Sequence, residues 1–88
     1  MKLKYIFETV ELGSEFIAVP VDTSAKELHG VLKLNKEGLE ILNLLKEETA
    51  ESSIVEVLSN KYENDRTVLA EYVHSFVEKL KISGIISE

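Results

Sequence analysis

Cysteine is absent from this chain of 88 residues. Disulfide bonds and thiolate zinc sites are therefore excluded, and a reducing compartment is favoured. No apolar run approaches the roughly 20 residues that a membrane-spanning helix needs. The basic start, Met1–Tyr5, is not followed by the apolar segment of a secretory signal. These absences predict a cytoplasmic protein with no membrane partner.

Basic residues are outnumbered, with ten Lys plus Arg against sixteen Asp plus Glu and a formal net charge of −6. Proteins that bind nucleic acid neutralise several phosphates with a basic surface, so no nucleic-acid partner is expected. The charge is uneven, because Lys26, Lys33 and Lys36 lie in one segment. We interpret them mainly as solvated surface charges. The less favoured interpretation is that they attract an acidic peptide.

No catalytic or metal-binding motif is present either. The chain has no G-x-S-x-G and no phosphate-cradling glycine loop, and the pair Glu47–Glu48 lies where a solvated helix end is expected. Two histidines occur, His29 and His74, and neither has a convincing ligand partner three or four residues away. A structural or surface role is predicted for both. We therefore expect no enzyme, no cofactor and no metal.

The first third of the chain has the residue pattern of strands. Tyr5–Leu12 and Phe16–Val21 contain β-branched and aromatic residues, and Gly13–Ser14 between them is a turn signal. They predict a β-hairpin. Pro20 has no backbone donor, so it is expected at a strand end, at a bulge or in an unpaired position.

A short third strand and a first helix come next. Residues 22–28 form a polar connection, and Gly30–Leu34 predicts the strand. Asn35 is a good N-cap for a helix over Lys36–Lys46. Gly38 in its first turn costs about 1 kcal/mol relative to alanine, which indicates close packing there.

Two further helices are predicted. Thr49 is expected to cap the second, over residues 50–61, and Asp65 or Thr67 is expected to cap the third, which runs to about Ile82. With the strands before them, the three helices have the layout of one winged-helix-like α+β domain, residues 1–88. Its N-terminal three-stranded antiparallel sheet precedes the three helices.

The third helix has the most regular apolar spacing. Its core-facing residues at helical spacing are Leu69, Val73, Phe76 and Leu80. Val68 and Tyr72 lie on one flank of this stripe, beside Ser75 and Lys79. Gly84 is expected to end the helix, and Ile85–Ile86 to pack back as a short tail.

An ordered set of these residues resembles the PqqD-like family. The set is Leu34-Asn35-x-x-Gly38-x-x-Ile41-x-x-Leu44-Leu45, then Thr49, Ile54, Leu58 and Tyr62, then Tyr72-Val73-x-x-Phe76-Val77-x-x-Leu80-x-x-x-Gly84-Ile85-Ile86. Members are precursor-peptide recognition elements of ribosomally made, modified peptides, named for pyrroloquinoline quinone biosynthesis. Leu42 stands where the family often has an aromatic residue, so the quinone precursor and another modified peptide both stay open.

The resemblance implies a binding mode as well as a fold. An extended leader peptide is expected to add as a strand along the third strand, in a groove closed by the third helix. The residues implied are Gly30, Val31, Leu32 and Lys33 on the edge, and Val68, Tyr72 and Phe76 on the apolar wall. Such an element does no chemistry and presents the peptide to a modifying enzyme, commonly a radical S-adenosylmethionine enzyme.

Less specific interpretations stay open at this point. Val68 and Tyr72 are also compatible with the rim of the core, and Gly30 with a bulge or turn. A winged helix-turn-helix with residues 50–61 as recognition helix is the alternative function, although Glu51 and Glu56 in that helix oppose phosphate. The third interpretation is a structural homodimer in which the exposed sheet edges of two copies pair with each other.

Overall fold

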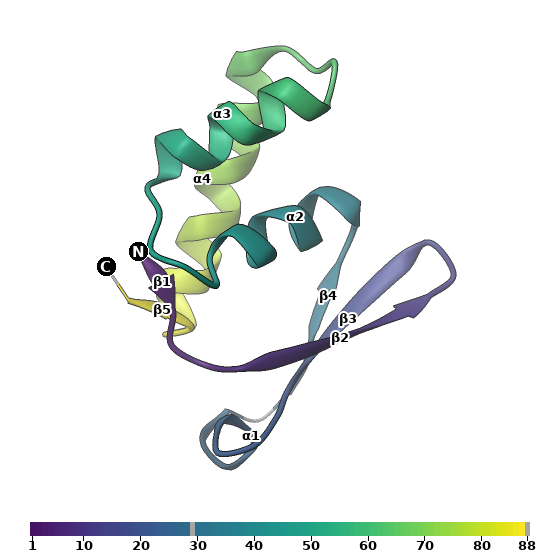
Figure 1. The fold of residues 1–88 in the computed structure, drawn as a ribbon, viewed down its shortest axis with the longest axis vertical. Helices are drawn as coiled ribbons and strands as arrows, with labels where there is room; N and C mark the ends of the chain where they lie inside the picture. The colour runs from purple at the N-terminus through teal and green to yellow at the C-terminus, as the bar shows by residue number, and fades with distance from the viewer. Residues whose placement is uncertain (29, 88) are drawn as a thin grey trace.

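Three strands form the sheet that the first third of the sequence predicts. They are β2 (Phe7–Leu12), β3 (Glu15–Pro20) and β4 (Leu32–Leu34), and the sheet order β2–β3–β4 is antiparallel throughout (Figure 1). The structure is a computed structural model that describes residues 1–28 and 30–87. β4 is shorter than predicted, so Gly30 and Val31 lie before the strand rather than in it.

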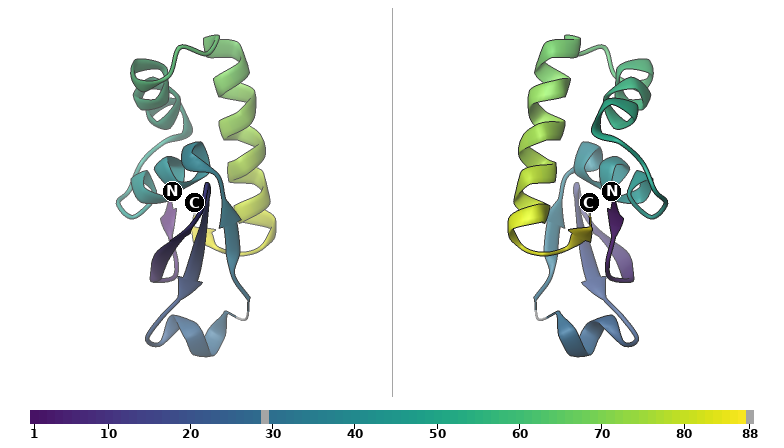
Figure 2. Two further views of the ribbon diagram at one scale, coloured as in Figure 1. Left: turned by 90° about the vertical axis from the view of Figure 1, so that its right-hand side faces the viewer. Right: turned by 90° about the vertical axis from the view of Figure 1, so that its left-hand side faces the viewer.

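Three longer helices follow the sheet, as predicted: α2 (Lys36–Leu44), α3 (Glu51–Lys61) and α4 (Arg66–Ile82). α4 runs beside the sheet on the side of β4, which Figure 2 shows from two opposite sides of the molecule. The core lies between these helices and the inner face of the sheet. Its fully buried side chains include Ile41, Leu42, Leu45, Ile54, Leu58, Val73 and Val77. The predicted α+β class and element order are confirmed.

Two of the three predicted helix caps are confirmed. Asn35 Oδ1 accepts the Gly38 N–H at 2.8 Å, and Asp65 Oδ1 accepts the Thr67 N–H at 2.7 Å. The prediction for Thr49 is wrong, because Ala50 occupies the N-cap of α3 and forms no side-chain cap hydrogen bond.

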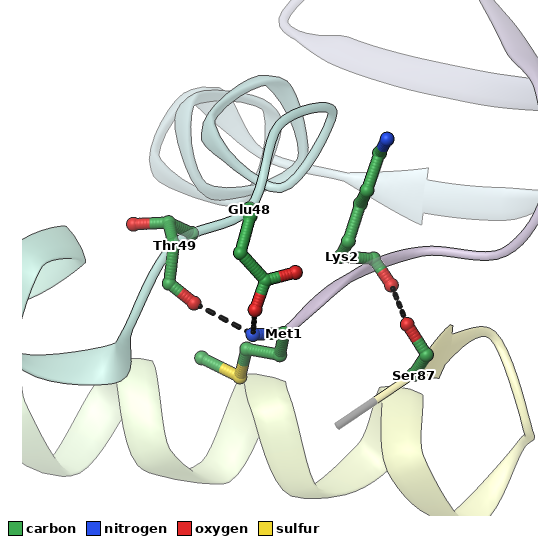
Figure 3. A network of polar contacts seen from close by, with 5 residues as sticks. All are labelled: Met1, Lys2, Glu48, Thr49 and Ser87. Atoms are coloured by element: carbon green, nitrogen blue, oxygen red, sulfur yellow. Dashed lines mark hydrogen bonds and ion pairs between the residues drawn. The ribbon is translucent and has the colours of Figure 1, made fainter.

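Thr49 is held outside α3 by the N-terminus. Its N–H donates to the Met1 carbonyl at 3.0 Å, and its carbonyl accepts the Met1 ammonium at 2.8 Å. Figure 3 shows this contact, together with the ion pair between the ammonium and Glu48 Oε1 at 2.6 Å. The N–H and the carbonyl of Thr49 are both bonded to Met1 rather than to α3, and the helix begins after Ala50.

The two ends of the chain also pair with each other. β1 (Lys2–Leu3) and β5 (Ile86–Ser87) form a second, two-stranded antiparallel sheet, and Ser87 Oγ donates to the Lys2 carbonyl at 3.2 Å (Figure 3). Ile85 and Ile86 are buried, which confirms that this segment packs back onto the core. Gly84 ends α4 with a φ of 73°, as predicted. This pairing fixes the C-terminal end of α4 against the start of the chain.

The connection over residues 22–28 contains a short helix that the sequence did not predict, α1 (Ser24–Glu27). Ser24 is buried, and its Oγ accepts the Ile6 N–H at 2.8 Å. This bond ties the connection to the segment that leads into β2. Within the described part of the chain, no helix is long and apolar enough to cross a membrane.

The caps yield a matched test of stability. We expect Asp65→Ala to lower the free energy of unfolding by about 1 kcal/mol, because α4 loses the acceptor for a first-turn N–H. Thr49→Ala should change it by less than about 0.5 kcal/mol, because only the backbone of Thr49 is bonded. Urea unfolding of both variants measures the difference. Equal losses in the free energy of unfolding would contradict the assignment of Asp65, and not Thr49, as a side-chain cap.

Candidate functional site

β4 is an edge strand, and the hydrogen bonds of the hairpin show which of its groups are unpaired. The Val21 N–H donates to the Ile6 carbonyl at 3.0 Å, just beyond the end of the β2–β3 ladder. In an antiparallel pair, N–H and C=O groups of alternate residues point to the same neighbour. The N–H and C=O groups of odd-numbered residues of β3 therefore point toward β2, and those of even-numbered residues point toward β4. Pro20, which has no N–H, falls in the even set at the strand end, where it costs no bond to β2.

The same alternation continues into β4. Phe16 pairs with Leu34 and Ala18 with Leu32, so these are the hydrogen-bonded pairs of the β3–β4 ladder. Lys33 lies between them, and its N–H and C=O point to the free edge. The open edge of the sheet thus offers one donor and one acceptor at Lys33.

A groove of about 450 Å³ lies between this edge and α4. Its lining residues are Glu15 from β3, Leu32, Lys33, Leu34 and Asn35 from β4 and its end, and Tyr72, Ser75, Phe76, Lys79 and Leu80 from α4. In Figure 2, α4 stands alongside β4 with no strand between them. The groove is therefore walled by apolar side chains and lies beside the unpaired backbone of the sheet edge.

One end of the groove is held by a small hydrogen-bonded cluster. Asn35 Oδ1 accepts the Tyr72 O–H at 2.9 Å and also the Gly38 N–H at 2.8 Å. Gly38 allows this approach, since a Cβ there would lie 3.1 Å from Cε2 of Phe76 and 3.2 Å from Asn35 Oδ1. The close packing predicted at Gly38 is confirmed. The cluster joins the end of β4, the start of α2 and the middle of α4.

The Tyr72 phenol is kept neutral in this position. Its partial burial raises the pKa of Tyr72 above the ordinary 10.0, the Asn35 hydrogen bond opposes this, and the Glu37 carboxylate raises the pKa further. A neutral phenol keeps its proton and so remains the donor to Asn35. The ring stays part of the apolar wall, tilted against Phe76 with ring centroids 6.4 Å apart.

The groove differs in charge from the chain as a whole. Its lining contains two lysines, Lys33 and Lys79, and one carboxylate, Glu15, whereas the chain has a net charge of −6. In the described part of the chain, Lys33 and Lys79 take part in none of the ion pairs. Both ammonium groups are therefore available to a bound molecule.

The seven residues predicted for the site do not all meet in one place. Leu32, Lys33, Tyr72 and Phe76 line the groove. Gly30 and Val31 line a smaller adjoining hollow of about 180 Å³, which shares Leu32 with the groove. Val68 lines neither hollow and is exposed, since it lies one turn of α4 before Tyr72.

Four polar residues of the groove were missed as site residues. Asn35 was predicted only as a helix cap, and Glu15 carried no signal because it lies at the hairpin end of β3. Ser75 and Lys79 could have been found, because the helical wheel places both on the same flank of α4 as Tyr72.

Neither histidine belongs to the groove. His29 lies outside the described residues. His74 is exposed on α4, with Nδ1 3.1 Å from Glu51 Oε2 of α3. Across residues 1–28 and 30–87, no group of three His, Cys, Asp or Glu side chains is placed to hold a metal ion.

An α+β domain with an open edge strand beside a helix-walled groove is a known fold. The chain matches the solved structure "TbiB1 in Complex with the TbiA(beta) Leader Peptide" over 100% of both chains, with a TM-score of 0.71 and 19% sequence identity. This likeness establishes a shared fold.

The family is established by sequence. The family described as Coenzyme PQQ synthesis protein D (PqqD) matches residues 13–86, and the chain belongs to this family. The resemblance inferred from the ordered residue set is thus confirmed. A comparison with curated proteins finds no match.

The environment of Tyr72 predicts how stability depends on pH. Its pKa is higher in the folded chain than the ordinary 10.0, so the stability from the neutral phenol is complete below about pH 10 and is lost as pH rises through the folded pKa. Between about pH 9 and about pH 11, the free energy of unfolding should therefore fall less in Tyr72→Phe than in the wild-type protein.

Urea unfolding at a series of pH values tests this prediction. Some of the fall should persist in the variant, because the pKa of Tyr62 is also raised, first by desolvation and then by Glu40 and Glu37. Curves for wild type and Tyr72→Phe that run parallel through this pH range would show that Tyr72 is not shielded from solvent.

Proposed function

We propose that this protein is a non-catalytic recognition element that binds the leader segment of a ribosomally made precursor peptide by strand addition. The observation that carries the proposal is the unpaired edge of β4, which lies beside a groove walled by α4. Membership of the PqqD family supports it, and so does the shared fold with TbiB1, whose structure contains a leader peptide.

The size of the edge determines where the affinity comes from. β4 has three residues, and Lys33 alone directs both backbone groups outward. Each added hydrogen bond contributes a net ~0.5–1.5 kcal/mol, so the ladder fixes direction and register more than affinity. Most of the binding free energy must come from apolar side chains of the peptide. The groove offers Tyr72, Phe76 and Leu80 to receive them.

The bound peptide would be delivered to a separate modifying enzyme, for which a radical S-adenosylmethionine enzyme is our proposal, in the cytoplasm. Among the described residues of the groove, no nucleophile is hydrogen-bonded to a base. The Tyr72 hydroxyl donates a hydrogen bond to the Asn35 amide oxygen, and Ser75 has no hydrogen-bonded partner. The proposed peptide is the quinone precursor or another modified peptide of the same origin.

Two alternatives lead to different observations. In the nucleic-acid reading α3 would enter a groove of DNA, but it presents Glu51 and Glu56, and its Lys61 is engaged by Glu40 at 3.0 Å. In the self-association reading the β4 edge pairs with a second copy of the chain. That reading uses the same Lys33 backbone, so it must be separated by experiment.

The alternation in β4 gives a sharp test of strand addition. Lys33→Pro removes an N–H that faces the free edge and leaves the β3–β4 ladder intact. We expect it to weaken binding of a candidate leader peptide, taken from a short reading frame near the gene, by roughly twofold to tenfold. Isothermal titration measures the affinity, and circular dichroism checks that the variant is folded.

A matched variant isolates the backbone contribution. Lys33→Thr removes the same ammonium group and keeps the N–H, so it should bind more tightly than Lys33→Pro. Equal affinity of the two folded variants would overturn strand addition at β4. Sedimentation of the wild type without peptide addresses the self-association reading, which predicts a concentration-dependent dimer that Lys33→Pro disrupts.

A further inference from the structure

The side chain of Asn35 has a fixed orientation. Its Oδ1 accepts two hydrogen bonds, from the Gly38 N–H at 2.8 Å and from the Tyr72 O–H at 2.9 Å. A backbone N–H can only donate, so the atom that faces Gly38 must be the amide oxygen. Two donors in these positions occupy both lone pairs of that oxygen.

The amide nitrogen of Asn35 is consequently left over. In the described part of the chain, Nδ2 has no hydrogen-bond partner, and Asn35 lines the groove at the end of β4. Its two N–H groups are therefore donors available to a molecule in the groove. They lie next to Lys33, whose N–H and C=O face the same edge.

Capping alone does not explain an asparagine here. At an N-cap, Asn, Asp and Ser are about equally good, because each supplies the same acceptor oxygen. Asp would also accept both bonds from Gly38 and Tyr72. Only Asn combines those two accepted bonds with donors directed elsewhere. This difference gives Asn35 a property that its structural role does not use.

The charged groups of the groove also favour a ligand that brings a hydrogen-bond acceptor. Lys33 and Lys79 are exposed donors without ion-pair partners in the described residues, and Glu15 is the one carboxylate of the lining. Donors and positive charge thus surround an apolar wall. Such a rim favours a peptide that brings an acceptor with negative charge.

We propose that Asn35 is a specificity-determining residue of the groove, whose amide donates to an acidic side chain of the bound peptide. The acidic residue lies beside an apolar residue seated against Tyr72 and Phe76, and Lys33 and Lys79 add attraction for its carboxylate. The inference rests on the proposed function, since it names the chemical pattern that this site selects in a leader peptide.

The test begins with a library of random twelve-residue peptides displayed on phage and selected on the wild-type protein. The proposal expects an Asp or Glu within two positions of an apolar residue in the selected sequences. Selected sequences without an acidic residue would overturn the inference and leave the proposed function standing. Failure to select any peptide that competes for the groove would count against the proposed function itself.

A single substitution then separates binding from capping. With one selected peptide, Asn35→Asp should lose at least about tenfold in affinity, because a donor becomes an anionic acceptor facing a carboxylate. Its melting temperature should not fall, because Asp caps α2 as well as Asn does. Unchanged affinity in Asn35→Asp would overturn the inference.

Changing the peptide provides the matching control. When the acidic residue of the selected peptide is replaced by its amide, wild type should lose affinity, and the penalty of Asn35→Asp should shrink. This coupling is a signature that a purely structural role of Asn35 would not produce. A penalty that is the same for both peptides would assign Asn35 to the scaffold.

Discussion

The pairing of β3 with β4 determines what the surface of this protein can bind. Alternate residues of an antiparallel strand point their backbone groups in opposite directions, so the register of one ladder fixes the groups left over on the next edge. Here the hairpin register directs the backbone N–H and C=O groups of Phe16 and Ala18 toward β4. The backbone groups of Lys33 therefore point to the free edge. A shift by one residue would turn Lys33 inward and leave Leu32 and Leu34 unpaired.

The unpaired edge borders a groove because α4 stands beside it. Gly38 permits the close approach of Phe76, and the hydrogen bonds of Asn35 join the end of β4 to Tyr72. At the other end, the pairing of β1 with β5 holds the segment that follows α4. The groove is thus clamped near both ends, and a peptide bound as proposed would enter a space that is already formed, which would limit the ordering cost of binding.

Much of this fold could be read from the sequence, because periodicity reports local structure directly. The spacing of Leu69, Val73, Phe76 and Leu80 predicted α4, and the turn at Gly13–Ser14 predicted the hairpin. The failures have a common cause in contacts between residues far apart in sequence. Thr49 has the chemistry of an N-cap, but a bond from the Met1 ammonium, 48 residues away, holds it outside the helix.

The site was predicted less completely than the fold. Of the residues that the family resemblance implied for peptide binding, Leu32, Lys33, Tyr72 and Phe76 line the groove. The second role of Asn35 was not visible, because a capping residue looks the same in sequence whether or not its amide nitrogen is used. The β1–β5 pair escaped prediction since strands of two residues carry no alternation.

The most direct test of the central claim is hydrogen exchange at single amides, measured by NMR with and without the leader peptide. In the free protein, the Leu32 and Leu34 amides should exchange slowly, because they pair with β3, and the Lys33 amide should exchange fast. Saturating peptide should slow exchange at Lys33 strongly. If the peptide binds and the Lys33 amide still exchanges as fast as before, the peptide does not add to β4 as a strand.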